Sequence, residues 1–242
     1  VHDADNPMDT RPVKWDFGAI GGQTGVLLAL PDLAGMAKPV VDPTWSSQPG
    51  AAEGKDTYLR EDNPNTNYGT TSLNVEGIGR SLLLFTLSFT ALTIQSATLT
   101  LRQILNEGTP AGNLVGAFPL LVNWVETEAT WNSRVSGTPW QTAGAGGAND
   151  AESTTQQNVQ CTNANTNYQW NVLDVVRRWY AGTLTNNGLL FKVVGNSVWR
   201  YFASSDHVTA AWRPMLEVVY SLATGSIERG RVAALSRMGA MR

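Results

Sequence analysis

The sequence predicts an all-β protein, a sandwich of two sheets with one short helix. Short runs with apolar residues at alternate positions recur between residues 56 and 222, separated by turns rich in Asn, Gly, Pro and Thr. Charged residues make up only 15% of the 242 residues, against about 25% in an average globular protein. The surface must therefore depend on uncharged polar side chains, which suits a β-protein with many turns. The only cysteine is Cys161, so an intrachain disulfide is excluded.

Residues 1–55 differ in composition from the rest of the chain. They are rich in Asp, Pro, Gly and Ala, and their prolines interrupt regular structure. One apolar patch, Gly25–Gly35, could be a short strand or a helix. Such a segment cannot bury much core of its own. We predict an extended N-terminal docking arm over 1–55, packed on its own domain or on a neighbouring subunit.

The strand signals begin at residue 56 and continue to residue 222, which we predict as the boundaries of the sandwich domain. The first strand leads into a polar turn at Asn63–Thr70. Alternation places Ala97, Leu99 and Leu101 on one face of the third strand, and Pro119 marks a bulge or an edge in the fourth. The strands expected in chain order are Asp56–Arg60, Ser81–Leu87, Ala97–Arg102, Leu114–Val122, Leu189–Val194 and Met215–Tyr220.

One amphipathic helix is expected over residues 171–182. Its apolar residues recur at the i, i+3, i+4, i+7 spacing of a helix face. Asn171 or Asp174 can cap its start, and Gly182 can end it. The residues of this face are Val172, Val175, Val176 and Trp179. A single helix over a sheet edge fits a jelly-roll β-sandwich.

Two further segments are expected outside regular strands. Residues 142–168 form a long Gly/Ala/Asn/Thr/Gln segment, which we predict to be an exposed loop. Residues 223–242 form a C-terminal basic tail that could be helical, with apolar residues roughly on one face. Such a segment can dock on a partner or lie on a membrane surface. Gly230 and Gly239 favour docking.

Several classes of ligand are not expected. The net charge is −3 and the basic residues are scattered, which argues against nucleic acid as a partner. No run of about 18 apolar residues exists to cross a membrane. Two histidines and one cysteine cannot build a zinc site. A structural calcium is conceivable, with Asp56, Asp62 and Asp206 as ligands, although their spacing matches no known calcium loop. No other cofactor is expected.

No catalytic residue is assigned. Glu126 and Glu128 could share a strand face as the two carboxylates of a glycosidase, but no second signal supports them. Cys161 is interpreted as a passive thiol, since neither histidine forms a recognisable pair with it. We therefore expect a protein that is not an enzyme, with a glycan-active enzyme as a distant alternative.

The aromatic residues are the richer signal, since the chain has nine tryptophans. Flat rings stack on the apolar C–H faces of sugars, although tryptophan also fills sandwich cores. Trp140 and Trp199 lie near Gly/Pro and Asn/Ser loops and are expected to be exposed. The candidate glycan-binding residues are Trp140, Trp199, Trp131 and Tyr68.

A series of motifs in fixed order carries a family resemblance. The motifs are Asp56–Arg60, Asn63–Pro64, Asn67–Gly69, Arg80–Phe85, Ile94–Leu99, Trp124–Glu126, Thr130–Asn132, Trp170–Trp179, Phe202–Ser205 and Arg213–Leu216. Together they resemble the DNRLRE-domain family. The resemblance implies a carbohydrate-binding-type jelly-roll module, found on secreted polysaccharide-active proteins and on bacteriophage structural proteins.

The chain departs from the secreted pattern, since it shows no catalytic domain, no signal peptide and two arms. These departures favour a non-enzymatic decoration protein of a bacteriophage virion. Its arms would bind other virion proteins or copies of itself as an oligomer. The sandwich would face outward and could bind host-surface polysaccharide, without contact to nucleic acid or a membrane. The alternative is a secreted, extracellular polysaccharide-binding module.

Overall fold

The computed structural model describes residues 2–3, 14–20, 23–29, 39–41, 43–91, 93–107, 113–195 and 199–223. The chain divides into two compact units. The terminal unit comprises Val1–Thr44, Thr90–Gln95 and Val219–Arg242, and the sandwich unit comprises Trp45–Phe89 and Ser96–Val218. The helix considered for the C-terminal basic tail falls on residues 224–242, outside the described residues.

In the terminal unit, the described residues form paired strands. β2 (Lys14–Ile20) and β3 (Gln23–Ala29) make an antiparallel hairpin. β1 (His2–Asp3) pairs with β4 (Pro39–Val41), which in turn pairs with the end of β17 (Met215–Ala223) at Leu222 and Ala223. The apolar patch interpreted as a strand or a helix contributes to a strand, β3.

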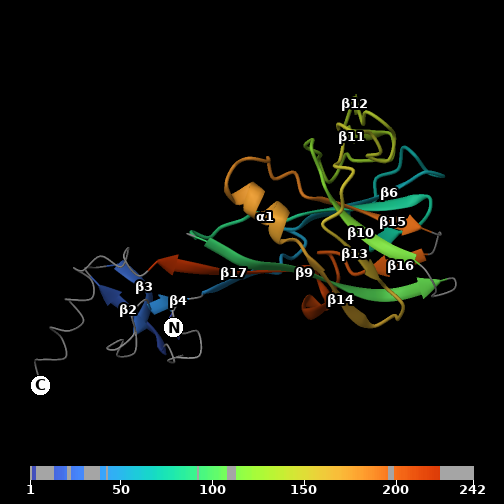
Figure 1. Cartoon of the computed structure of the whole chain (residues 1–242). Helices are drawn as coiled ribbons and strands as arrows, with labels where there is room; N and C mark the ends of the chain where they lie inside the picture. Colours follow the sequence, from blue (N-terminus) through green and yellow to red (C-terminus); the bar gives the residue numbers. More distant parts are fainter. Residues whose placement is uncertain are drawn as a thin grey trace, which may run out of the picture. The chain divides into compact units, whose positions relative to one another are not determined.

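The sandwich unit contains two antiparallel sheets that lie one over the other (Figure 1). The five-stranded sheet has the order β13-β10-β15-β8-β6, with β6 Lys55–Arg60, β8 Gly79–Leu84, β10 Asn113–Pro119, β13 Gln157–Gln160 and β15 Leu189–Gly195. The second, which we call the β9 sheet, has the order β17-β9-β16-β7, and β14 also pairs with β9. Its strands are β7 Leu73–Val75, β9 Thr93–Glu107, β14 Thr166–Asn171, β16 Trp199–Phe202 and β17 Met215–Ala223.

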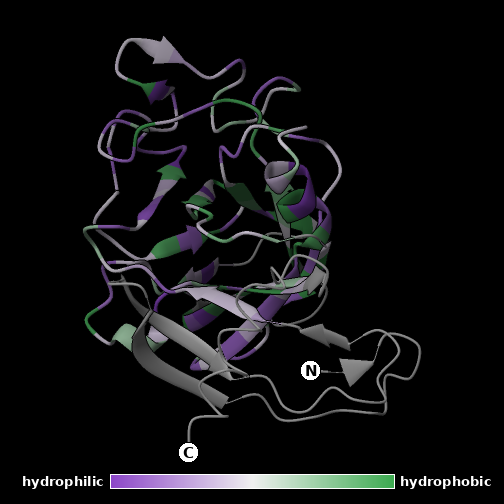
Figure 2. Cartoon of the chain, turned by 90° about the vertical axis from the view of Figure 1, so that its left-hand side faces the viewer, coloured by the Kyte–Doolittle hydropathy of each residue, from purple (hydrophilic) through white to green (hydrophobic). Residues whose placement is uncertain are grey.

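Smaller elements complete the fold and are β5 Thr44–Ser47, β11 Ser133–Val135, β12 Thr138–Pro139, α1 Leu173–Tyr180 and the 3-10 turn Ala210–Trp212. The predicted β-sandwich with one short helix is confirmed. Each predicted strand is present, with boundaries shifted by a few residues. Green and purple segments alternate along the strands in Figure 2, as expected of strands with one buried and one solvated face.

The core between the two sheets is built around Trp170. Its ring packs edge-on against Phe191 and Phe202, with centroid distances of 5.5 and 5.9 Å. Its indole N–H donates to the carbonyl oxygen of Val115 at 2.9 Å, so the buried polar atom is satisfied. Leu99 lies on β9 beside these rings and is fully buried. The alternation read in the sequence therefore selects the core face correctly.

The helix α1 has the predicted buried face, since Val175, Val176 and Trp179 are buried. The N-cap residue is Val172, which makes no side-chain capping bond, so neither Asn171 nor Asp174 takes the predicted N-cap position. The Asn171 side-chain oxygen still accepts a hydrogen bond from the backbone N–H of Leu173 at 3.0 Å. Gly182 follows the helix with a φ of +70°, a conformation that favours glycine.

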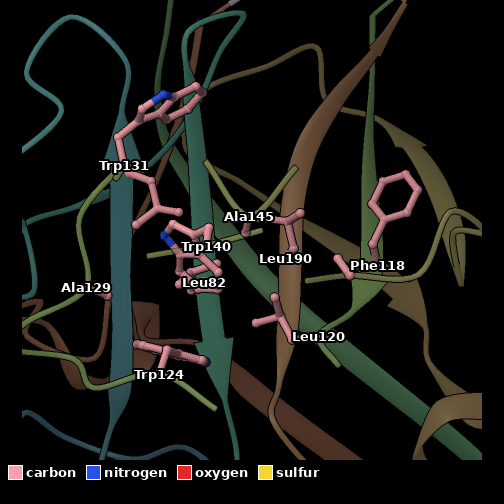
Figure 3. Close-up of a cluster of buried hydrophobic side chains, with 11 residues drawn as sticks. Leu82, Phe118, Leu120, Trp124, Ala129, Trp131, Trp140, Ala145 and Leu190 are labelled. Atoms are coloured by element: carbon pink, nitrogen blue, oxygen red, sulfur yellow. The ribbon is translucent and has the colours of Figure 1, made fainter. Parts of the chain in front are cut away.

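The long connection between β10 and β13 covers the outer side of the five-stranded sheet. We call residues 121–156 the cover segment. Its side chains pack on the sheet in a second hydrophobic cluster, and Figure 3 shows Trp131, Trp140 and Ala145 against the strands that carry Leu82 and Leu190. The prediction of one exposed loop over 142–168 is wrong, because part of this stretch seals the cluster and part forms β13 and β14.

Candidate functional site

The predicted exposure of Trp140 is wrong. Its side chain is only 4% exposed, and its indole N–H donates to the carbonyl oxygen of Thr130 at 2.8 Å. Trp131 lies in the same cluster and is 8% exposed. The reason is that the cover segment folds back on the sheet, which local sequence does not reveal. Neither ring offers a face to a sugar.

The other two candidates lie on strands and turns of the sandwich. The Tyr68 ring stacks on Tyr58 with a centroid distance of 4.1 Å and an interplanar angle of 24°, so one of its faces is occupied. Trp199 opens β16 and is 38% exposed. Of the four predicted glycan-binding residues, Trp199 has the most open ring.

Strand register places Trp199 beside two side chains that the sequence interpretation did not select. Because Arg200 and Phe202 are buried on the core side of β16, Trp199 and Tyr201 point to the opposite face. Tyr201 pairs across the strands with Leu105, which is 47% exposed. Three apolar or aromatic side chains thus gather on the outer side of the β9 sheet.

Polar side chains continue this outer side along β9 and β14. Arg102 is opposite Asn167, and its guanidinium donates to the Asn167 side-chain oxygen at 3.2 Å. Gln169 is opposite Thr100 and donates to its hydroxyl oxygen at 3.4 Å. The Arg102 guanidinium also lies 4.6 Å from the centre of the Trp212 ring. We call the set Leu105, Trp199, Tyr201, Arg102, Asn167 and Gln169 the outer face.

The outer face combines the two kinds of group that a sugar needs. The exposed Trp199 ring and the half-buried Tyr201 ring provide flat apolar surface. The guanidinium group donates hydrogen bonds, and the amide groups donate and accept them. The apolar and polar ends are separated along β9 by the three residues from Arg102 to Leu105, about 10 Å at 3.3 Å per residue. A chain of sugar units can contact both ends at once.

A separate group of carboxylates surrounds the start of β6. Asp56 is fully buried, and one of its carboxylate oxygens accepts the Ser205 backbone N–H at 2.8 Å. The pKa of Asp56 is raised to about 7, chiefly by burial, with smaller contributions from the charges of Glu126 and Asp206. Burial also raises the pKa of Glu126, whose carboxylate accepts the Asp56 backbone N–H at 2.8 Å.

This group does not form a recognisable metal centre. Three aspartates were considered as calcium ligands. The charge of Asp206 acts on Asp56 and contributes to its raised pKa. The Asp62 carboxylate instead forms a salt bridge with Arg60, with 2.5 Å between Oδ1 and Nε. Within the described part of the chain, no three or more His, Cys, Asp or Glu side chains are arranged to hold a metal ion.

The side chains that the sequence analysis weighed as catalytic groups are Glu126, Glu128 and Cys161, and each has a structural explanation. Glu126 accepts the Asp56 N–H, and Glu128 accepts the backbone N–H of Ser136 at 2.8 Å. Cys161 is buried, and burial raises the pKa of its thiol to about 12. The Arg200 guanidinium donates to the Cys161 carbonyl oxygen inside the sandwich. No helix among the described residues is long and apolar enough to cross a membrane.

The fold and the outer face define a β-sandwich module, and the sequence comparison then gives its family. The chain belongs to the family of the Disaggregatase related repeat domain, whose model matches residues 56–218. No curated protein matches the chain.

The resemblance to the DNRLRE family is therefore wrong, and the bacteriophage setting loses the family match on which it was based. The quoted motifs contribute mainly to general features of the sandwich. Asp56 binds the backbone at Ser205, Trp124 lies in the covered cluster, and Trp170 fills the core. Packing positions of this kind recur in β-sandwiches of different families, so they do not distinguish one family from another.

Proposed function

We propose that this chain is a non-catalytic polysaccharide-binding module that acts outside the cell, and that the outer face of the β9 sheet binds the glycan. The observation that carries the proposal is the exposed Trp199 ring, placed by strand register beside Tyr201 and Leu105. Large exposed aromatic side chains on a sheet face are the type of surface that stacks on sugar rings.

The polar end of the outer face supports the same function. Arg102, Asn167 and Gln169 form cross-strand contacts that hold their donors and acceptors in place, and Asn167 and Gln169 remain exposed. A preorganised polar surface loses little side-chain entropy when a ligand binds. This arrangement suits the hydroxyl groups of a sugar better than a purely apolar partner.

The carboxylates support binding without catalysis. Glu126 and Glu128 each accept a hydrogen bond from a backbone N–H, and they lie apart from the outer face in the chain. A glycosidase needs two carboxyl groups that flank the bound sugar. In the proposed function, the outer face binds polysaccharide and leaves it intact.

The test is affinity electrophoresis of the full chain through gels that contain soluble polysaccharides, neutral and acidic. Trp199→Ala is expected to weaken the affinity obtained from the retardation by roughly 10- to 150-fold, since an aromatic side chain that becomes buried contributes roughly 1.5–3 kcal/mol. Tyr180→Ala is the matched control, because Tyr180 is equally exposed at 38% but lies on α1. Equal retardation of the wild type and Trp199→Ala would contradict the proposed site.

The expected virion location, and the partners expected through the two arms, stay predictions of the sequence. The C-terminal tail lies outside the described residues, and only strands are described between residues 1 and 42. The polysaccharide-binding proposal depends on neither arm.

A further inference from the structure

Two basic side chains, those of Arg80 and Lys192, lie on neighbouring strands on the outer side of the five-stranded sheet. β8 and β15 are antiparallel, with Leu190 opposite Leu82 and Phe191 opposite Ser81. Continued by one position, this register would place Lys192 opposite Arg80. Their charges interact, since Arg80 contributes to lowering the pKa of Lys192. Like charges in directly opposite positions of a sheet are destabilising.

The contacts of these two cations are with rings and a carbonyl group. The Lys192 ammonium lies 4.2 Å from the centre of the Phe118 ring. The Arg80 guanidinium donates to the Gly144 carbonyl oxygen at 2.6 Å and lies 5.1 Å from the centre of the Trp131 ring. Neither forms a salt bridge within the described residues, and the acidic group acting on Arg80 from a distance is Glu61.

The surroundings favour an anion at this position. Burial lowers the pKa of both Arg80 and Lys192, which means that their charged forms have lost hydration. Aromatic faces replace only part of that hydration, about 0.5–2 kcal/mol per contact. The Lys192 ammonium keeps donors for which the described chain supplies no oxygen acceptor, and an oxyanion would fill that role.

The row of residues opposite Lys192 continues with a glycine and an amide. Lys192 is opposite Gly116, which in turn is opposite Asn158 on β13. A Cβ atom at residue 116 would lie 2.6 Å from the Phe118 ring and 2.7 Å from the Asn158 side-chain oxygen, so these two side chains already fill the space over Gly116 and a larger residue would displace them. The exposed Asn158 amide is thus a third polar group on the same face.

We propose that Arg80 and Lys192 form a binding site for an oxyanion, a carboxylate or a sulfate group, carried by an acidic polysaccharide. The choice of a polysaccharide as the carrier rests on the proposed function. Arginine binds planar oxyanions through two parallel N–H groups, and lysine adds a point charge beside it. Two cations on a chain of net charge −3 do not make the extended basic track that a nucleic-acid backbone requires.

The experiment measures binding of the full chain to polygalacturonate, dextran sulfate and uncharged dextran at constant ionic strength. Lys192→Gln and Lys192→Glu change the proposed site, and thermal unfolding verifies that each variant folds. Arg177→Gln is the control, since it removes one positive charge from an exposed position of α1. Comparison of polygalacturonate with dextran sulfate separates the carboxylate from the sulfate.

We expect the acidic polymers to bind more tightly than dextran, and Lys192→Gln to weaken their binding about tenfold, the value of one charge-assisted hydrogen bond. Lys192→Glu should weaken it further, and Arg177→Gln should have no effect. Acidic polymers that bind folded Lys192→Glu as tightly as wild type would overturn the oxyanion site. If Trp199→Ala still weakens their binding in that case, the proposed function stands without the oxyanion site.

The reverse outcome is equally informative. Binding that depends on Lys192 but is unchanged in Trp199→Ala would keep the oxyanion site and remove the outer face of the β9 sheet as the glycan site. A protein that binds none of the three polymers would contradict the oxyanion site.

Discussion

The two sheets of the sandwich differ in what lies on their outer sides. The five-stranded sheet is covered by residues 121–156, which bury Trp131 and Trp140 in a hydrophobic cluster. The β9 sheet leaves Trp199 and Tyr201 on an outer side with polar neighbours. The same residue type therefore stabilises the fold on one sheet and is available for binding on the other. The length of the connections, rather than the composition of the strands, causes this difference.

The largest expected effect contrasts a covered tryptophan with an open one. Trp140→Ala should reduce the free energy of unfolding by about 3–5 kcal/mol, because it leaves a cavity and an unpaired Thr130 carbonyl group. Trp199→Ala should reduce it by about 1 kcal/mol or less. Urea unfolding of both variants measures the difference. Equal losses would mean that the two outer sides do not differ as described.

A second prediction concerns pH and the buried carboxyl group at the start of β6. The pKa of Asp56 is raised from 3.8 to about 7, chiefly by burial, so the folded state holds this proton more tightly than the unfolded state. The resulting stabilisation is complete below about pH 4 and is lost as the pH rises through 7. It amounts to at most about 4 kcal/mol, since one pKa unit corresponds to about 1.4 kcal/mol.

Asp56→Asn should therefore flatten the fall of unfolding free energy between pH 4 and pH 7. The Ser205 N–H, Glu126 and Asp206 face this carboxyl group, and the raised pKa of Glu126 leaves a smaller slope in the variant. Asp62→Asn is the control, since Asp62 is exposed. The idea fails if urea titrations across this pH range give Asp56→Asn the same slope as the wild type.

A third prediction tests how the cover segment is held. The Asp150 carboxylate accepts the backbone N–H groups of Gln141, Thr142 and Gly147 at 2.8 to 3.0 Å, and Asp150 is only 2% exposed. Asp150→Ala should cost about 2–3 kcal/mol, because buried donors lose their acceptor. In Asp150→Ala, faster amide exchange confined to residues 141–147, with glycan binding unchanged, would support the role of Asp150 in holding the cover segment. Unchanged exchange would contradict it.

The sequence allowed prediction of the local features of the fold but not of the long-range ones. Alternation around Leu99 and the apolar spacing of Trp179 predict a strand and a helix, because those patterns depend on neighbouring residues. The burial of Trp140 depends on where a long connection folds back. The outward direction of Tyr201 depends on Arg200 lying inside the sandwich, which reverses the usual preference of a charged side chain for solvent.

The smallest expected effect concerns Lys192, which lies on β15 and interacts with the charge of Arg80. Lys192→Gln should raise the free energy of unfolding by about 0.2–1 kcal/mol, because it removes a like charge opposite Arg80. Lys192→Glu should raise it by a similar or larger amount through attraction to the same guanidinium. Urea unfolding at low and high salt measures both changes, and screening should reduce them. A loss of stability in Lys192→Glu would show that the two side chains are not close, and that the outer side of this sheet has no cationic pair.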